Sequence, residues 1–244
     1  ALAATTTGSF NTALGYIAGL ANTTGHSNVA IGYKTFQANT TGCLNTASGG
    51  YSLMTNTTAS CNTAYGYGSL KLNTTGTQNT ASGVYSLREN TTGSYNVAMG
   101  REALKVNTTG CMNTSVGRNS MLSNVTGKFN TAVGATALNS QTCGCENTAV
   151  GVCSMYANIS GGMNTAIGMH SLGGNTCGWY NTATGRGAMK CNTTGFENTA
   201  SGYRALLINS TGGCNTALGS RALNSATTAN RNVAIGYKAM MDNT

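Results

Sequence analysis

A short pattern recurs every 17 residues along this chain, and that period constrains the fold more than any other feature. The motif N-[TV]-[AS]-x-G occurs fourteen times, and no insertion or deletion interrupts the spacing. Its copies begin at Asn11, Asn28, Asn45, Asn62, Asn79, Asn96, Asn113, Asn130, Asn147, Asn164, Asn181, Asn198, Asn215 and Asn232. Fixed periods of about this length are typical of solenoids, in which each repeat buries its apolar side against its neighbours. We therefore interpret residues 1–244 as a single repeat array.

Some positions of the repeat are constrained and others are free. Counted from its Asn, the repeat reads N-T-A-x-G-x-x-[AS]-L-x-x-N-T-T-G-x-x. Position 1 is Asn and position 5 is Gly in every copy. The first three copies contribute Asn11, Asn28, Asn45, Gly15, Gly32 and Gly49. Positions 6, 7, 10, 11, 16 and 17 accept almost any residue, so we expect them to face solvent.

The composition favours strands and turns over helices. The chain has 34 Gly and no Pro, which suits a fold with many corners and no interruption of its ladders. The constrained segments have the length of short strands. We predict an all-β, parallel β-solenoid or β-roll of about fourteen coils. Stacked Asn side chains at positions 1 and 12 would bond along ladders with a rise of about 4.8 Å. Positions 3, 8 and 9 would fill the interior, and Gly at 5 and 15 would supply positive φ.

Position 4 carries an apolar residue in nine of the fourteen copies. The predicted interior is thin, and its burial offsets little of the entropy lost when 17 residues are ordered. We therefore predict that chains associate laterally through position 4, as a side-by-side trimer. The sequence starts and stops within repeats and has no distinct cap, so we expect a window of a longer array or a subunit that stacks end to end.

Segments such as Asn28-Val29-Ala30-Ile31-Gly32 and Asn232-Val233-Ala234-Ile235-Gly236 resemble the head repeat of YadA-like trimeric autotransporter adhesins. Similar repeats are found in tail and host-recognition fibres of viruses. The resemblance covers all fourteen copies, although the family repeat is shorter than the one found in this chain. It implies a left-handed parallel β-roll, three chains side by side, and a role in adhesion or fibre display. The family's motif residues are structural, so the resemblance implies no catalytic residue.

The acidic and sulfur-containing residues do not form a recognisable catalytic or metal site. Glu146 and Glu197 share position 17 but lie three coils apart, about 14 Å, which is too far for a hydrolase with paired carboxylates. The nine cysteines lack the spacing of zinc ligands or of a disulfide framework, and interchain bonds are the alternative. They are Cys43, Cys61, Cys111, Cys143, Cys145, Cys153, Cys177, Cys191 and Cys214. We interpret His26 and His170 as surface residues, and expect no catalytic residue, metal or cofactor.

Two columns of basic residues are the main candidates for a binding site. Lys71, Arg88 and Lys105 occupy position 10 of consecutive coils. Arg204, Arg221 and Lys238 occupy position 7 of the last three. Like charges on adjacent rungs repel, so one hypothesis is that each column binds an anionic ligand such as an acidic polysaccharide. The alternative is ordinary solvated charge. A net charge of +8 from only 13 basic residues is sparse for a nucleic-acid-binding protein.

Threonine-rich and Asn-x-Ser/Thr segments suggest further alternatives. The N-T-T-G segment contains recurrent glycosylation acceptor sequences, although we favour a corner with an Asn ladder. Position 2 is Thr in eleven copies, as in the Thr arrays of ice-binding solenoids. Val29, Val97 and Val233 replace Thr there, which we interpret as a sign that position 2 faces inward.

These observations favour a structural or adhesive fibre segment that projects from a cell or virion surface and presents a binding surface. The first alternative is a self-stacking extracellular filament subunit, and the second is an ice-binding solenoid. The expected partners are other copies of the chain, a host surface or an anionic glycan. No run of 18 apolar residues occurs, so we expect no transmembrane segment.

Overall fold

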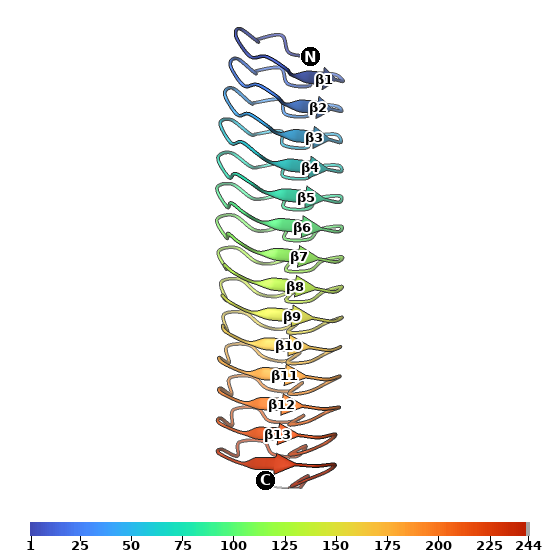
Figure 1. Ribbon diagram of the computed structural model, residues 1–244, viewed down its shortest axis with the longest axis vertical. Helices are drawn as coiled ribbons and strands as arrows, with labels where there is room; N and C mark the ends of the chain where they lie inside the picture. Colours follow the sequence, from blue (N-terminus) through green and yellow to red (C-terminus); the bar gives the residue numbers. More distant parts are fainter. Residues whose placement is uncertain (243–244) are drawn as a thin grey trace. The chain divides into compact units, whose positions relative to one another are not determined.

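The three residues after each repeat Asn form a short β-strand in the computed structural model, which describes residues 1–242 (Figure 1). The chain divides into two compact units, one from Ala1 to Thr126 and one from Gly127 onward. The first unit contains β1 (Thr12–Leu14), β2 (Val29–Ile31), β3 (Thr46–Ser48), β4 (Thr63–Tyr65), β5 (Thr80–Ser82), β6 (Val97–Met99) and β7 (Thr114–Val116). The second contains β8 (Thr131–Val133), β9 (Thr148–Val150), β10 (Thr165–Ile167), β11 (Thr182–Thr184), β12 (Thr199–Ser201), β13 (Thr216–Leu218) and β14 (Val233–Ile235).

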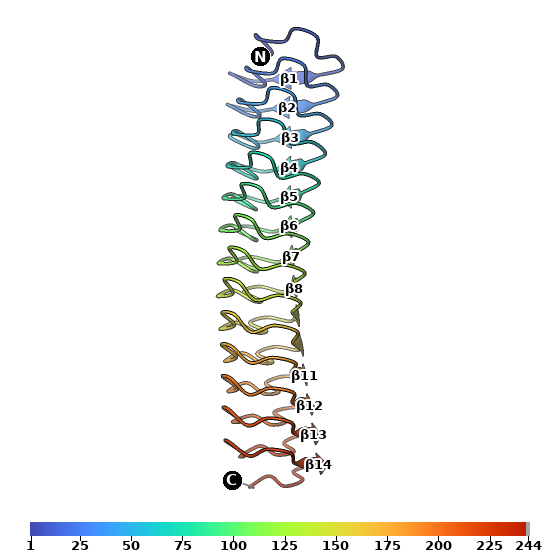
Figure 2. The same cartoon turned by 90° about the vertical axis from the view of Figure 1, so that its left-hand side faces the viewer.

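Within each unit, every strand pairs in parallel with the next strand along the chain (Figures 1 and 2). Paired residues are equivalent positions of successive repeats, as in Ala47 with Ala64 in the first unit and Ala183 with Ala200 in the second. Coils therefore stack with one repeat per turn. The predicted parallel β-solenoid with coils of 17 residues is confirmed, while the handedness and the number of associated chains stay predictions.

The interior of each coil is filled by the positions that the repeat constrains. Ala at position 3, Ala or Ser at position 8 and Leu or Met at position 9 are buried, as Ala47, Ser52 and Leu53 show. The Asn ladders are also present. The amide nitrogen of Asn39, at position 12, donates to the side-chain oxygen of Asn22 at 2.7 Å. The predicted interior, with its polar ladders beside a thin apolar strip, is therefore confirmed.

The two Asn ladders meet at the backbone of position 15. The carbonyl oxygen of Gly42 accepts from the side-chain amides of Asn28 at 2.9 Å and Asn39 at 3.0 Å. A Cβ on Gly42 would collide with the carbonyl oxygen of Ala59 in the next coil. The prediction that Gly at position 15 supplies positive φ was wrong, since no described glycine at that position has it. Gly is favoured there because side chain and backbone atoms crowd the site.

Left-handed backbone recurs at positions 5, 7, 9 and 17, mostly with bulky residues. Gly49 has a φ of 131°, and Tyr51, Leu53 and Cys61 have values of 60°, 46° and 62°. Such conformations cost about 1–3 kcal/mol each for residues other than Gly. Backbone hydrogen bonds between coils offset this cost, since the amide of Tyr51 donates to Tyr33 at 2.9 Å. The sharp turns that result allow a short coil to close.

Positions 2 and 4 both point out of the solenoid. Side chains alternate between the two faces of a strand, so position 3 points inward and its neighbours point outward. Position 2 is half-buried or exposed in every coil, as at Val29 and Thr80, and Ile31 and Tyr65, at position 4, are exposed. The prediction that position 2 faces inward was therefore wrong. Position 4 forms a stripe on the outer face of the strands in each unit, mostly apolar and interrupted by Ser or Thr in two coils of each unit.

Candidate functional site: the basic edge

Basic residues and tyrosines gather at positions 6, 7 and 10 of the coil, which we call the basic edge. Eleven of the thirteen Lys and Arg residues and eight of the eleven Tyr residues of the chain occupy these three positions. The basic ones are Lys34, Lys71, Arg88, Arg101, Lys105 and Arg118 in the first unit and Arg186, Lys190, Arg204, Arg221 and Lys238 in the second. Non-glycine residues at these positions are half-buried or exposed. Most of the positive charge of each unit is thus concentrated on one edge.

The backbone explains why these three positions share an edge. Gly at position 5 follows the strand with a positive φ, and the residues at positions 7 and 9 also have left-handed backbone, so the chain turns sharply here. Positions 8 and 9 point inward in this arrangement, which leaves 6, 7 and 10 outside. Contacts between positions 7 and 10 confirm that they are neighbours in space, since Lys71 Nζ lies 5.3 Å from the ring centroid of Tyr51.

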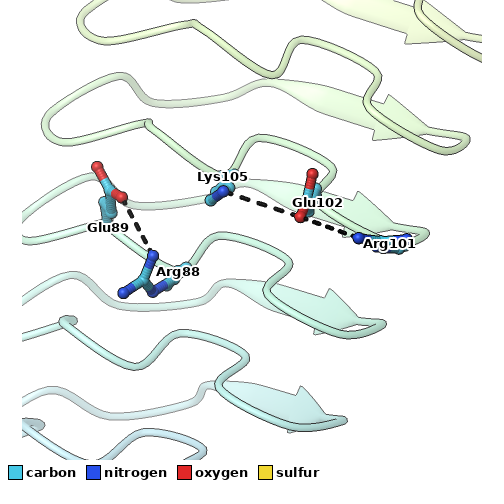
Figure 3. Close-up of polar contacts among 5 residues, drawn as sticks. All are labelled: Arg88, Glu89, Arg101, Glu102 and Lys105. Carbon is cyan, nitrogen blue, oxygen red and sulfur yellow. Dashed lines mark ion pairs between the residues drawn. The ribbon is translucent and has the colours of Figure 1, made fainter.

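The first predicted basic column has partners for all of its members, and Figure 3 shows those of Arg88 and Lys105. Lys71 rests against Tyr51, as described above. Arg88 forms an ion pair with Glu89 at 3.7 Å, and Lys105 forms one with Glu102 at 3.8 Å. Glu102 also pairs with Arg101, at 3.6 Å. Two carboxylates thus lie among the column's charges and reduce their mutual repulsion, although partly exposed ion pairs of this kind contribute little stability.

The second predicted column lies against tyrosines. The guanidinium groups of Arg204 and Arg221 lie 5.1 Å and 6.0 Å from the ring centroid of Tyr203. Lys238 Nζ lies 5.3 Å from that of Tyr237. In the part of the chain that the structure describes, no carboxylate forms an ion pair with these three cations. This column therefore keeps its full positive charge, held in place by cation–π contacts of about 0.5–1 kcal/mol each at exposed sites.

Five tyrosines on consecutive coils of the first unit form a continuous row, which we call the Tyr ladder. Its members are Tyr16, Tyr33, Tyr51, Tyr67 and Tyr85, and neighbouring ring centroids lie 5.3–5.6 Å apart. The first pair is stacked and the others meet edge to face. The two basic columns alone did not predict the ladder. The recurrence of Tyr at positions 6 and 7 of five successive repeats is the sequence signal that could have revealed it.

Two glycines lie beside rings of the Tyr ladder. The rings shift between positions 6 and 7, and Gly50 and Gly68 fill the alternate position in the third and fourth coils. A Cβ on Gly68 would lie 2.8 Å from the ring of Tyr85, and one on Gly50 would touch the ring of Tyr67 at 3.4 Å. Burial and the neighbouring Tyr33 raise the pKa of Tyr51 above its ordinary value.

The basic edge of the second unit contains a hollow of about 360 Å³. It lies where Gly173 and Gly174 leave positions 10 and 11 without side chains, between Tyr156 and Lys190 of the adjacent coils. Cys153 and His170 also line it. His170, predicted to be a surface residue, is half-buried at this hollow. The hollow is mainly apolar and has one cation at its rim.

A second hollow of about 470 Å³ lies away from the basic edge, at positions 16 and 17. Its lining includes Phe196, Cys214 and Arg231. The thiol of Cys214 lies 3.5 Å from a carboxylate oxygen of Glu197. Burial, followed by the hydrogen bond and negative charge of Glu197, raises the pKa of Cys214 above the ordinary thiol value. This thiol is therefore a weaker nucleophile at neutral pH than an unperturbed cysteine.

All nine cysteines are free, and each is half-buried or exposed. Across residues 1–242, no group of three or more His, Cys, Asp or Glu side chains could hold a metal ion. The same residues include no helix with the length and apolar character needed to cross a bilayer.

Comparison of the chain with family models, curated proteins and solved structures finds no match. The resemblance to YadA-like head repeats therefore stays a prediction that rests on the motif itself.

Proposed function

We propose that this chain is a structural and adhesive segment of an extracellular fibre on a cell or virion surface, and that it presents the basic edge to a partner. The observation that supports this most directly is that the constrained and the variable positions of the repeat have different roles. Constrained positions build the interior, and eleven of thirteen basic residues stand at three outward positions. No enzymatic step is part of this proposal.

A regular edge suits an extended anionic partner better than a small molecule. Because successive coils repeat the same backbone, side chains of the edge recur with a spacing of about 4.8 Å. Each cation–π or exposed ionic contact is weak alone. A partner that touches many coils at once gains avidity, because each further contact forms within the same complex. A polyanion such as an acidic polysaccharide has this chemistry.

The test compares two double variants with the same loss of charge. Arg204→Ser with Arg221→Ser removes two cations from the basic edge. Lys128→Ser with Arg231→Ser removes two cations at positions 16 and 17, the only basic residues off the edge. Binding to immobilised acidic polysaccharide should weaken about tenfold or more in the first variant and much less in the second. Equal losses in the two variants would show that only net charge matters and would overturn the proposal.

We further propose that chains associate side by side through the exposed stripe at position 4. In the second unit Val133, Val150 and Ile167 lie on successive strands of this stripe and are exposed. Ile167→Lys should shift sedimentation toward smaller species. The control Val152→Lys, an equally exposed apolar residue at position 6, should leave the distribution unchanged. A fixed oligomer supports display by a discrete fibre, whereas growth with concentration supports the alternative of a stacking filament.

Ice binding is a second candidate, because Thr at position 2 faces outward. This column gives each unit a row of threonines on the strand face, where Thr46, Thr63 and Thr80 occupy consecutive coils. Large side chains at position 4, such as Tyr65, interrupt the flatness of the same face. Thermal hysteresis or faceted growth of ice crystals with the purified protein would favour this function over adhesion. Their absence would remove it.

A further inference from the structure

We infer that the Tyr ladder of the first unit is a platform for one extended acidic polysaccharide chain, which lies along the stack of coils. This inference deepens the proposed function and rests on it. It names the ligand class and the residues of this site, which differs from both predicted basic columns.

The ladder is a built surface rather than a scatter of exposed rings. Its five rings touch in sequence, as described above, and Gly68 lies where a side chain would displace the ring of Tyr85. By contrast, Tyr65 and Tyr95 of the same unit lie at positions 4 and 17. Neither of them takes part in a ring contact with another described residue. They are therefore natural controls for the ladder.

The charges beside the ladder call for an anionic ligand. The first unit has six basic and two acidic residues, and all six basic residues lie on the basic edge. Lys34 Nζ lies 5.4 Å from the ring centroid of Tyr33, and Lys71 lies at a similar distance from Tyr51. Neither lysine forms an ion pair with a carboxylate of the described residues. Two unneutralised cations therefore accompany the rings.

The arrangement of the rings favours sugars over nucleobases. Single-stranded nucleic acids bind aromatic platforms through free ring faces on which bases stack. In the ladder, faces are shared with the edge of a neighbouring ring or with a cation, as at Tyr33, Tyr51 and Tyr85. What remains is a row of ring edges, phenol hydroxyls and cations. Hydroxyl groups and carboxylates of an acidic sugar match that chemistry.

The spacing of the platform also suits a polymer of sugars. A monosaccharide unit in an extended chain advances by a distance similar to one rung of the solenoid, which is about 4.8 Å. Successive sugars could therefore meet successive tyrosines without bending the ligand. A short oligosaccharide would touch only one or two rings and would bind far more weakly than a polymer.

The experiment measures binding of the full chain to polygalacturonate, a linear polymer of uronic acid, at low ionic strength. Tyr33→Ala with Tyr67→Ala should weaken binding about tenfold. The control pair Tyr65→Ala with Tyr95→Ala, equally exposed, should change it by less than about twofold. Unfolding midpoints close to that of the unmodified chain would show that the solenoid is intact in both variants. As a second variant that leaves every ring in place, Lys34→Gln with Lys71→Gln should weaken binding to a similar extent and reduce its salt dependence.

Four other outcomes would contradict the inference. Equal losses in the two tyrosine pairs would overturn the inference. Tighter, ladder-dependent binding of oligothymidylate than of polygalacturonate would replace the sugar polymer with a single-stranded nucleic acid. Binding that survives in the ladder variants but is lost when Arg204 and Arg221 are replaced would overturn the ladder and leave the proposed function standing. Equal binding of neutral dextran would show that the charge of the ligand has no role, which contradicts the inference.

Discussion

A Cβ atom on Gly49 would lie 2.7 Å from the carbonyl oxygen of Gly66, the equivalent glycine of the next coil. Gly49 also has a φ of 131°, a conformation that residues with a side chain rarely adopt. Because the coils approach so closely here, position 5 tolerates no larger residue. This relationship explains why all fourteen copies carry Gly at that position.

Gly49→Ala should therefore lower the free energy of unfolding by about 2–4 kcal/mol, through backbone strain and overpacking. The adjacent Gly50 has no positive φ, and its added Cβ would meet only ordinary contacts. Gly50→Ala should cost less than about 1 kcal/mol. Chemical denaturation of both variants checks this, and equal midpoints would refute the account of position 5.

Asn45→Ala should destabilise the solenoid through its interior hydrogen bonds. Asn45 donates its side-chain amide to the carbonyl of Ala59 at 2.9 Å and accepts from the backbone of Asn62 at 3.0 Å. Truncation leaves buried partners unsatisfied, at a cost of about 1–3 kcal/mol for each group. Gln37→Ala, at an outward position, is the control and should change stability by less than about 0.5 kcal/mol. Unfolding midpoints in denaturant report both.

Leu87→Ala tests how much the thin apolar strip contributes. Leu87 is fully buried at position 9, so its truncation should cost about 2–5 kcal/mol. Leu72, at position 11, is exposed, and Leu72→Ala should change stability by less than about 1 kcal/mol. Thermal and chemical unfolding measure the difference. A small effect at Leu87 would mean that the ladders alone hold the coil.

Glu102→Gln should strengthen binding to a polyanion. Glu102 lies 3.6 Å from a guanidinium nitrogen of Arg101 and 3.8 Å from Lys105 Nζ, so its removal frees two cations of the basic edge. We expect the affinity for polygalacturonate to rise by about two- to fivefold at low salt and the gain to vanish at high salt. Glu146→Gln makes the same change of net charge away from the edge. A gain of the same size there would argue against a local effect.

Glu197→Gln should increase the reactivity of Cys214. Glu197 helps to raise the pKa of the Cys214 thiol, so loss of its charge should lower that pKa and increase the thiolate fraction at neutral pH. Alkylation of Cys214 by iodoacetamide, followed by peptide mass spectrometry, should then become faster, and its pH profile should move to lower pH. Cys61 lies at the same repeat position and is exposed, so its rate is the internal reference. An unchanged ratio of the two rates would contradict the assignment.

The interior was predictable because its residues repeat. Asn39 and Leu53 belong to columns that hardly vary within the chain, and a column of identical residues needs identical surroundings in every coil. The basic edge was predictable only in part. Lys71, Arg88 and Lys105 share one position, whereas Tyr51 and Tyr67 lie at different positions and meet only because the backbone brings 6 and 7 together.

By itself, the sequence determined the period, the register and the inward positions, because a repeat of constant length stacks like upon like. The tertiary structure alone decided that position 2 faces outward, that Gly at position 15 is favoured by crowding, and which free positions form one edge. The edge depends on left-handed turns at residues such as Tyr51 and Leu53. Bulky side chains such as these do not indicate a left-handed backbone in a sequence. Hydrogen bonds from the adjacent coils hold that backbone conformation in place.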